Sequence, residues 1–154
     1  MEIDFQKAKE EYSTGKYTLV LCKNEDIITS DLTGIRPLLK VFDEKKECKG
    51  YSAADKIIGR AAAFLYILLE VKNLYGEIMS KGAIEILKKA GINYEYKTLT
   101  DFIENRQKNG ICPMDEAVKN INDAKEACEA IRNKIKFLQQ QIHKWNTYLK
   151  KIKF

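Results

Sequence analysis

The segment from residue 73 to residue 99 constrains the fold more than any other part of the chain. It reads NLYGEIMS, then KGAIEILKKAG, then INYEYKTL. The first stretch is typical of a buried strand, the second has helical spacing and ends at Gly91, and the third alternates between apolar and polar residues. A strand, a helix and a second strand at this spacing predict a βαβ unit. We therefore expect parallel strands in a sheet with helices packed against it, an α/β fold.

The N-terminal third adds further elements to this unit. Apolar spacing over residues 3–12 predicts a short helix, and two β-rich runs at 17–22 and 27–30 surround the polar turn KNED, which predicts a hairpin. Pro37 is expected at the first position of a short helix that continues through Phe42. Beyond the βαβ unit, residues 100–118 predict a helical turn, a loop through KNGICP and a further helical start.

The stretch KGYSAADKIIGRAAAFLYILL, residues 49–69, is interpreted as the start and body of a buried helix. Ser52 is a fitting N-cap, and Asp55 lies three residues later, where the acid of a capping box would be found. From Ile57 to Leu69 the sequence is apolar on nearly every helical face, so the helix must be covered on several sides. Its longest apolar run has nine residues, too few for a membrane span, which needs about 18.

The C-terminal part predicts one long amphipathic helix. Its apolar positions alternate steps of four and three without error: Ala124, Cys128, Ile131, Ile135, Leu138, Ile142, Trp145, Leu149 and Ile152. Residues 133–154 hold six lysines and no acid; because the whole chain carries +5, the rest carries −1. We expect one domain at residues 1–121, followed by this helix at 122–154.

Composition narrows the function classes. The chain opens with charged residues rather than a signal peptide, and its four cysteines form no C-x-x-C pair, so we expect a cytoplasmic protein with reduced thiols. No glycine-rich phosphate loop, paired catalytic carboxylates or Ser/His/Asp set can be assembled. We expect no metal and no cofactor.

Several motifs in order, YTLVLCK, GIRPLL, SAADKIIGRAAAFLYILL, YGEIMSKGAIEIL and NRQKNGICPMDEAV, resemble the prokaryotic domain of unknown function 1893. The resemblance covers roughly residues 3–131. It implies a cytidine-deaminase-like fold, a three-layer α/β/α arrangement around a mixed sheet. It would place the 49–69 helix where true deaminases carry zinc ligands.

The zinc chemistry of deaminases does not follow from this resemblance. Zinc nucleobase deaminases need H-x-E at one helix start and P-C-x-x-C at the next. The corresponding places here read YSAADK and MSKGAIEIL, and the single histidine, His143, belongs to the C-terminal helix. A zinc-dependent deaminase is therefore excluded at the level of the sequence.

Two helix N-termini at the carboxyl edge of the sheet are the predicted ligand site, because exposed N–H groups and helix dipoles attract anions. The candidate ligand-binding residues are Ser52, Asp55, Lys56, Arg60, Ser80 and Lys81, together with Asn105, Arg106 and Cys112 from the following loop. The structural alternative is that the serine and aspartate only cap helices, the lysines are solvated and the arginine pairs locally. A catalytic role for Cys112 lacks a nearby histidine as base.

The sequence thus predicts a zinc-free, deaminase-like domain that binds a small anionic or nucleotide-like ligand. A second hypothesis is a metal-independent enzyme with Asp55 and Lys56 as acid and base, which requires a buried lysine. The C-terminal helix could pack on its own domain, on a partner protein or antiparallel on a second copy. A less favoured alternative is that its lysines bind an anionic surface such as nucleic acid or lipid headgroups. A parallel homodimer is disfavoured because flanking positions such as Lys125, Arg132, Lys134 and Lys153 have no acid to pair with.

Overall fold

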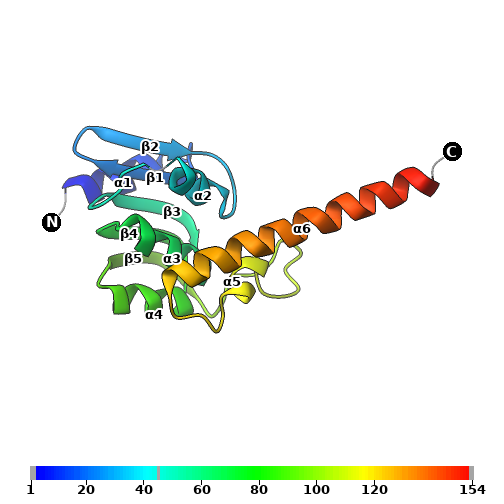
Figure 1. Ribbon diagram of the computed structural model, residues 1–154. Coiled ribbons are helices and arrows are strands. Elements are labelled where there is room, and N and C mark those ends of the chain that lie inside the picture. The colour runs from blue at the N-terminus through cyan, green and yellow to red at the C-terminus, as the bar shows by residue number, and fades with distance from the viewer. Residues whose placement is uncertain (1–2, 45, 153–154) are drawn as a thin grey trace.

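The computed structural model describes residues 3–44 and 46–152, and its centre is a mixed five-stranded sheet (Figure 1). The strands are β1 (Leu19–Lys23), β2 (Asp26–Ser30), β3 (Ser52–Ile58), β4 (Asn73–Ser80) and β5 (Asn93–Thr100). Their order across the sheet is β2-β1-β3-β4-β5. Strands β3, β4 and β5 run parallel, whereas β1 is antiparallel to both β2 and β3. The predicted hairpin and the predicted βαβ unit are both present.

Helices cover both faces of the sheet, which gives three layers. They are α1 (Ile3–Ser13), α2 (Arg36–Asp43), α3 (Arg60–Leu69), α4 (Lys81–Ala90), α5 (Pro113–Ala117) and α6 (Ala124–Ile152). On β1, Val20 packs with Ala8 of α1, whereas the alternate residues Leu19 and Leu21 belong to the larger core under α3. Helix α1 therefore lies on one face, and α3, which packs against α4 and α6, lies on the other. The predicted α/β class and its long C-terminal helix are confirmed.

The main error of the sequence interpretation concerns residues 52–58, which form β3 rather than the first turns of a helix. Gly59 separates this strand from α3, which begins at Arg60. Ala53 and Ala54 are fully buried on opposite faces of the sheet, so the first part of this central strand is covered from both sides, whereas Lys56 and Ile57 are exposed. Pairing with β1 and β4 outweighs the local capping pattern, and neither Ser52 nor Asp55 caps a helix.

Smaller differences occur at two other places. Pro37 occupies the second helical position of α2, after Arg36, rather than the first. Residues 101–104 do not form a helical turn; the loop there closes through an isolated antiparallel bridge between Glu104 and Ile111. Helix α4 ends at Gly91 as predicted, with this glycine in the left-handed conformation at φ 75°.

Helix α6 has two parts with different environments. In its first part Ala127, Cys128 and Ile131 are buried against the domain. Its second part projects away from the domain, and Ile142 and Trp145 there are 61% and 59% exposed (Figure 1). The expected packing on the chain's own domain thus holds for the first part. Lys153 lies outside the described residues. None of the described helices is both long enough and apolar enough to cross a membrane.

Candidate functional site

Two helices begin side by side at the carboxyl edge of the parallel strands. Ile58 of β3 pairs with Met79 of β4, so the chain leaves both strands at the same edge of the sheet. Helix α3 then starts at Arg60 and α4 at Lys81, and the two helices pack on each other. The side chain of Ser80 caps α4 by accepting a hydrogen bond from the N–H of Ala83 at 3.1 Å. The predicted pair of helix starts therefore exists, with the first start at Arg60 instead of Ser52.

The N-terminus of α3 is occupied by a carboxylate from the chain itself. The Oδ1 atom of Asp115, a buried residue of α5, accepts a hydrogen bond from the N–H of Ala61 at 2.9 Å. Burial raises the pKa of Asp115, while the N–H groups of Ala61 and Arg60 and the charge of Arg60 act in the opposite direction. A Cβ atom on Gly59 would lie 2.0 Å from Oδ2 of Asp115, so this approach requires glycine. The expected anion position at α3 is thus filled internally.

One N–H donor of Arg60, at Nε, has no hydrogen-bond partner among the described residues. Its stem crosses the start of α4 at Gly82, where an added Cβ would lie 2.8 Å from the Cγ of Arg60. In residues 3–44 and 46–152, its Nε is the single buried side-chain nitrogen or oxygen without a hydrogen-bond partner. Leaving a buried donor unpaired costs about 1–3 kcal/mol, and more for a charged group. A ligand atom that accepts a hydrogen bond from this nitrogen would remove that cost.

A cavity of about 100 Å³ lies beside this arginine, and we call it the carboxyl-edge pocket. Its lining residues come from the starts of α3 and α4, the loop after β5 and the α5 region: Arg60, Ser80, Gly82, Asp101, Phe102, Ile111, Asp115, Glu116 and Lys119. Phe102 and Ile111 are 46% and 44% exposed, so they present apolar surface. The pocket therefore combines the buried Nε of a half-buried arginine with apolar side chains.

Two exposed ion pairs lie beside or within this lining. Lys81 contacts Asp101 at 2.8 Å, and Lys119 contacts Glu116 at 2.6 Å. The pairing with Asp101 raises the pKa of Lys81, and Lys81 in turn lowers the pKa of Asp101. These cations are neutralised by neighbours, so the charge that a ligand could use is that of Arg60.

Several predicted site residues lie outside the pocket. Ser52 is at the opposite end of β3, where its hydroxyl accepts from Asn73 at 3.0 Å. The side chain of Asn105 pairs with Asn109 in the exposed loop, where Arg106 is also exposed. Cys112 precedes α5, and its carbonyl accepts from the N–H of Glu116 at 2.9 Å. Of the nine predicted residues, Arg60 and Ser80 line the pocket and Lys81 lies beside it.

Asp55 and Lys56 do not form an acid/base pair. Adjacent residues of a strand point to opposite faces, and Lys56 is exposed, so the buried lysine that this chemistry needs is not there. Asp55 instead accepts a hydrogen bond from the hydroxyl of Tyr66 at 2.6 Å. Burial raises the pKa of Asp55 to about 7, although Tyr66 and two backbone N–H groups favour its charged form. Its structural role is to hold α3 on the sheet.

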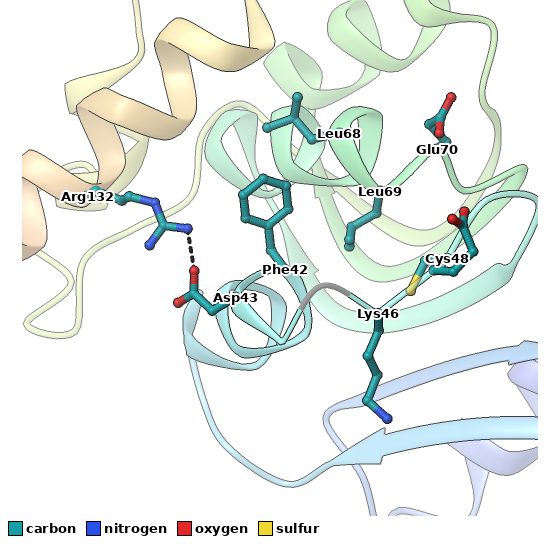
Figure 2. A pocket seen from close by; sticks show the side chains of 9 residues that line it. Phe42, Asp43, Lys46, Cys48, Leu68, Leu69, Glu70 and Arg132 are labelled. Atoms are coloured by element: carbon teal, nitrogen blue, oxygen red, sulfur yellow. Dashed lines mark hydrogen bonds and ion pairs between the residues drawn. The ribbon is translucent and has the colours of Figure 1, made fainter.

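A larger hollow of about 460 Å³ lies at the other end of α3, between α2, α6 and the loop before β3 (Figure 2). Phe42 and Leu69 form apolar parts of its wall, and Arg132 forms an ion pair with Asp43 across it. Helix carbonyls rather than N–H groups point toward this end of α3. No buried, unpaired side-chain polar atom is found here in the described part of the chain, so the carboxyl-edge pocket is the stronger candidate site.

Seven of the nine lining residues were missed at the sequence level: Gly82, Asp101, Phe102, Ile111, Asp115, Glu116 and Lys119. Pro113 marks the start of α5, yet the burial of Asp115 against another helix depends on tertiary packing. Gly59 was the available signal for the true start of α3, because a glycine between two apolar runs often separates elements. Among the described residues, no three His, Cys, Asp or Glu side chains are grouped as a metal site would require.

The fold and the pocket define a three-layer α/β protein with a small cavity at the carboxyl edge of its parallel strands. The family model for the domain of unknown function DUF1893 matches residues 7–135, so the chain belongs to this family. A solved structure of a DUF1893 family protein from Thermotoga maritima is similar in fold. The TM-score is 0.80 at 20% identity, over 87% of this chain and 92% of that one. None of the curated proteins compared matches the chain.

Proposed function

We propose that this protein is a zinc-free binding domain of cytidine-deaminase-like architecture that captures a small acidic ligand in the carboxyl-edge pocket. The proposal is supported by the mixed sheet with helices on both faces and by the two helix starts at one sheet edge. Ligands of open α/β sheets bind at that edge. Fold likeness alone does not assign a function, whereas the pocket residues and their chemistry can support one.

The observation that carries the proposal is the buried, unpartnered Nε of Arg60. A guanidinium binds carboxylate and phosphate groups through directed N–H donors, and its charge makes such hydrogen bonds about twice as strong as neutral ones. Asp115 lies close enough to influence Arg60 electrostatically, but its oxygens are directed to the start of α3. The arginine therefore retains a donor for a further acceptor.

The size of the pocket limits what can enter it. Pockets for whole drug-sized ligands measure roughly 300–1,000 Å³. The carboxyl-edge pocket, at about 100 Å³, has room for one acidic group. A nucleotide-like ligand would place its phosphate at Arg60 and cover Phe102 and Ile111, which are exposed, with its apolar or aromatic part. The ligand class is a small molecule with one acidic end and one flat or apolar end.

Native mass spectrometry of the gently purified protein tests this function. The wild type should carry a bound small molecule, or acquire one from a panel of inorganic phosphate, nucleoside monophosphates and aromatic carboxylates. Arg60→Gln should lose it, because the guanidinium is removed while the stem over Gly82 is largely kept. Arg106→Gln is the matched control, since it removes one guanidinium from an exposed loop position.

Thermal unfolding of the variants separates binding from folding. Equal binding by wild type and Arg60→Gln, with both folded, contradicts the proposal. Loss of binding in Arg106→Gln alone would move the site to the exposed loop. The double variant Lys56→Ala, Lys81→Ala should keep its ligand, because both lysines are exposed and Lys81 is already paired.

A further inference from the structure

The second part of α6, residues 135–152, presents an apolar stripe that is open to solvent over most of its length. Ile135 at its start packs against the core of the domain, whereas the residues from Ile142 onward are exposed. The stripe consists of Ile135, Leu138, Ile142, Trp145, Leu149 and Ile152, and the last four are 37–61% exposed. A contiguous exposed apolar surface of this kind marks an interaction site. An isolated helix of this length is also marginal in water, so a partner would stabilise it. This segment lies almost entirely beyond the part of the chain that the family model covers.

We propose that this stripe pairs antiparallel with the same stripe of a second copy of the chain. The steps between its apolar residues are three, four, three, four and three, so the pattern reads the same in both directions about the point between His143 and Lys144. In this register Leu138 of one copy faces Leu149 of the other. Ile142 faces Trp145 twice, once on each side of the two-fold axis.

The residues that flank the stripe favour self-association. In an antiparallel helix pair, each heptad position at the edge of the contact surface lies opposite the same heptad position of the other helix. Gln139 would meet Asn146 of the second copy along one flank, and Gln141 would meet Tyr148 along the other, so within residues 135–152 no flanking charge opposes a like charge. The lysines of this segment, Lys136, Lys144, Lys150 and Lys151, occupy outer positions of the helix. An acidic partner or a nucleic acid would instead require the lysines to border the contact surface.

The position of the domain selects the antiparallel orientation. The stripe of α6 is continuous, and its first part, including Cys128 and Ile131, is already buried against the chain's own domain. A parallel partner helix would have to enter the space that this domain occupies. An antiparallel partner meets only the part of α6 that projects from the domain (Figure 1). The two domains would then lie at opposite ends of the helix pair. Pairing over this length buries on the order of 1,000 Å², near the lower limit for a specific interface. The dimer should therefore dissociate on dilution.

Sedimentation equilibrium of the full chain over a wide concentration range tests the proposal. The wild type should move reversibly between 17.8 kDa and twice this mass. Ile142→Asp combined with Leu149→Asp should remain monomeric, because charges would be buried in the seam. The matched control, Gln140→Asp with Thr147→Asp, adds the same charge at exposed positions outside the stripe and should still dimerise.

A cysteine pair tests the orientation. Gln139→Cys combined with Asn146→Cys should form a disulfide between copies, detected by non-reducing mass spectrometry, whereas either substitution alone should not. Crosslinking by the single variants instead would contradict the register. A wild type that stays monomeric up to about 100 μM, roughly the weak end of specific association, would overturn the proposal. Binding of that monomer to a polyuridylate or to an acidic helical peptide would assign the stripe to those partners instead.

Discussion

Replacing Gly59 with alanine should destabilise the protein, although its backbone, at φ −105° and ψ −165°, suits any residue. At such a position alanine usually stabilises a protein by about 0.4–1 kcal/mol, because it restricts the unfolded chain. Here the added methyl group would lie 2.0 Å from Oδ2 of Asp115 and 2.7 Å from Cγ1 of Ile103. The contact with Asp115 cannot be relieved cheaply, since this carboxylate is buried and fixed by the N–H of Ala61.

The magnitude follows from two costs and one gain. Overpacking a filled interior costs about 1–3 kcal/mol. Moving Asp115 away from Ala61 leaves a buried N–H group unpaired, which costs about 1–3 kcal/mol more. After the gain from the unfolded chain is subtracted, the free energy of unfolding should fall by about 3 kcal/mol, or roughly 6–12 °C in the melting temperature of a domain of this size.

Urea unfolding followed by far-ultraviolet circular dichroism measures this effect, with an unchanged dependence on urea as the sign that two-state unfolding persists. The control is the same substitution in an Asp115→Ala background. There the conflicting oxygen is gone, so Gly59→Ala should cost far less than in the wild type. Additive effects of the two substitutions would refute the argument, because they would show that Gly59 and Asp115 do not interact.

Three further predictions concern the core, the helix end and the edge of the pocket. The pKa of Asp55 rises from 3.8 to about 7 on folding, so the folded state keeps a proton that the unfolded chain loses, and stability should decrease as pH rises from about 4 to 7. Asp55→Asn should abolish that pH dependence and raise the free energy of unfolding at pH 8 by up to about 4 kcal/mol. Urea unfolding at pH 5 and pH 8 measures both effects, and a pH dependence that persists in the variant would show that Asp55 is not its source. Gly91→Ala should cost about 1 kcal/mol in the same assay because φ is 75°, and an unchanged midpoint would show that the helix end relaxes. Lys81→Ala should leave the melting temperature unchanged because its ion pair with Asp101 is exposed, and a clear loss would indicate that the pair supports the start of α4.

Local patterns were sufficient to predict most elements of this fold. The βαβ unit from β4 to β5 has a buried strand, a helix closed by glycine and an alternating strand, and each signal agrees with the tertiary structure. The hairpin of β1 and β2 and the length of α6 followed from periodicity in the same way. In each of these elements the apolar residues recur at the regular spacing of a helix or a strand.

Strand β3 could not be recognised from its local sequence. Ser52, two alanines and Asp55 resemble a capped helix start, and small residues carry little preference for a strand. Their conformation is decided by burial between two other strands and under α1 and α3, which no local pattern reports. The partly buried hydrogen bond from Tyr66 to Asp55 likewise joins a strand to the following helix, and no local sequence pattern predicts it.

The candidate site was predicted in position but not in composition. The carboxyl edge, Arg60 and Ser80 were identified because parallel strands deliver helix starts to one side of a sheet. Asp115 was not identified. Because this carboxylate occupies the start of α3, the group left for a ligand is Arg60 rather than the N–H groups of that helix. Asp115 thus takes the place that an anionic ligand would have at the start of α3. It reaches this place through the packing of α5, which is a tertiary contact.

Arginine-selective NMR of the side-chain Nε–H groups observes the proposed hydrogen-bond donor of Arg60 itself. The chain has four arginines, so Arg60→Gln and Arg106→Gln assign the two signals that matter. On titration with inorganic phosphate and then with a nucleoside monophosphate, the Arg60 signal should shift and saturate while the Arg106 signal stays in place. An Arg60 signal that does not respond, or responds no more than that of Arg106, would contradict the account.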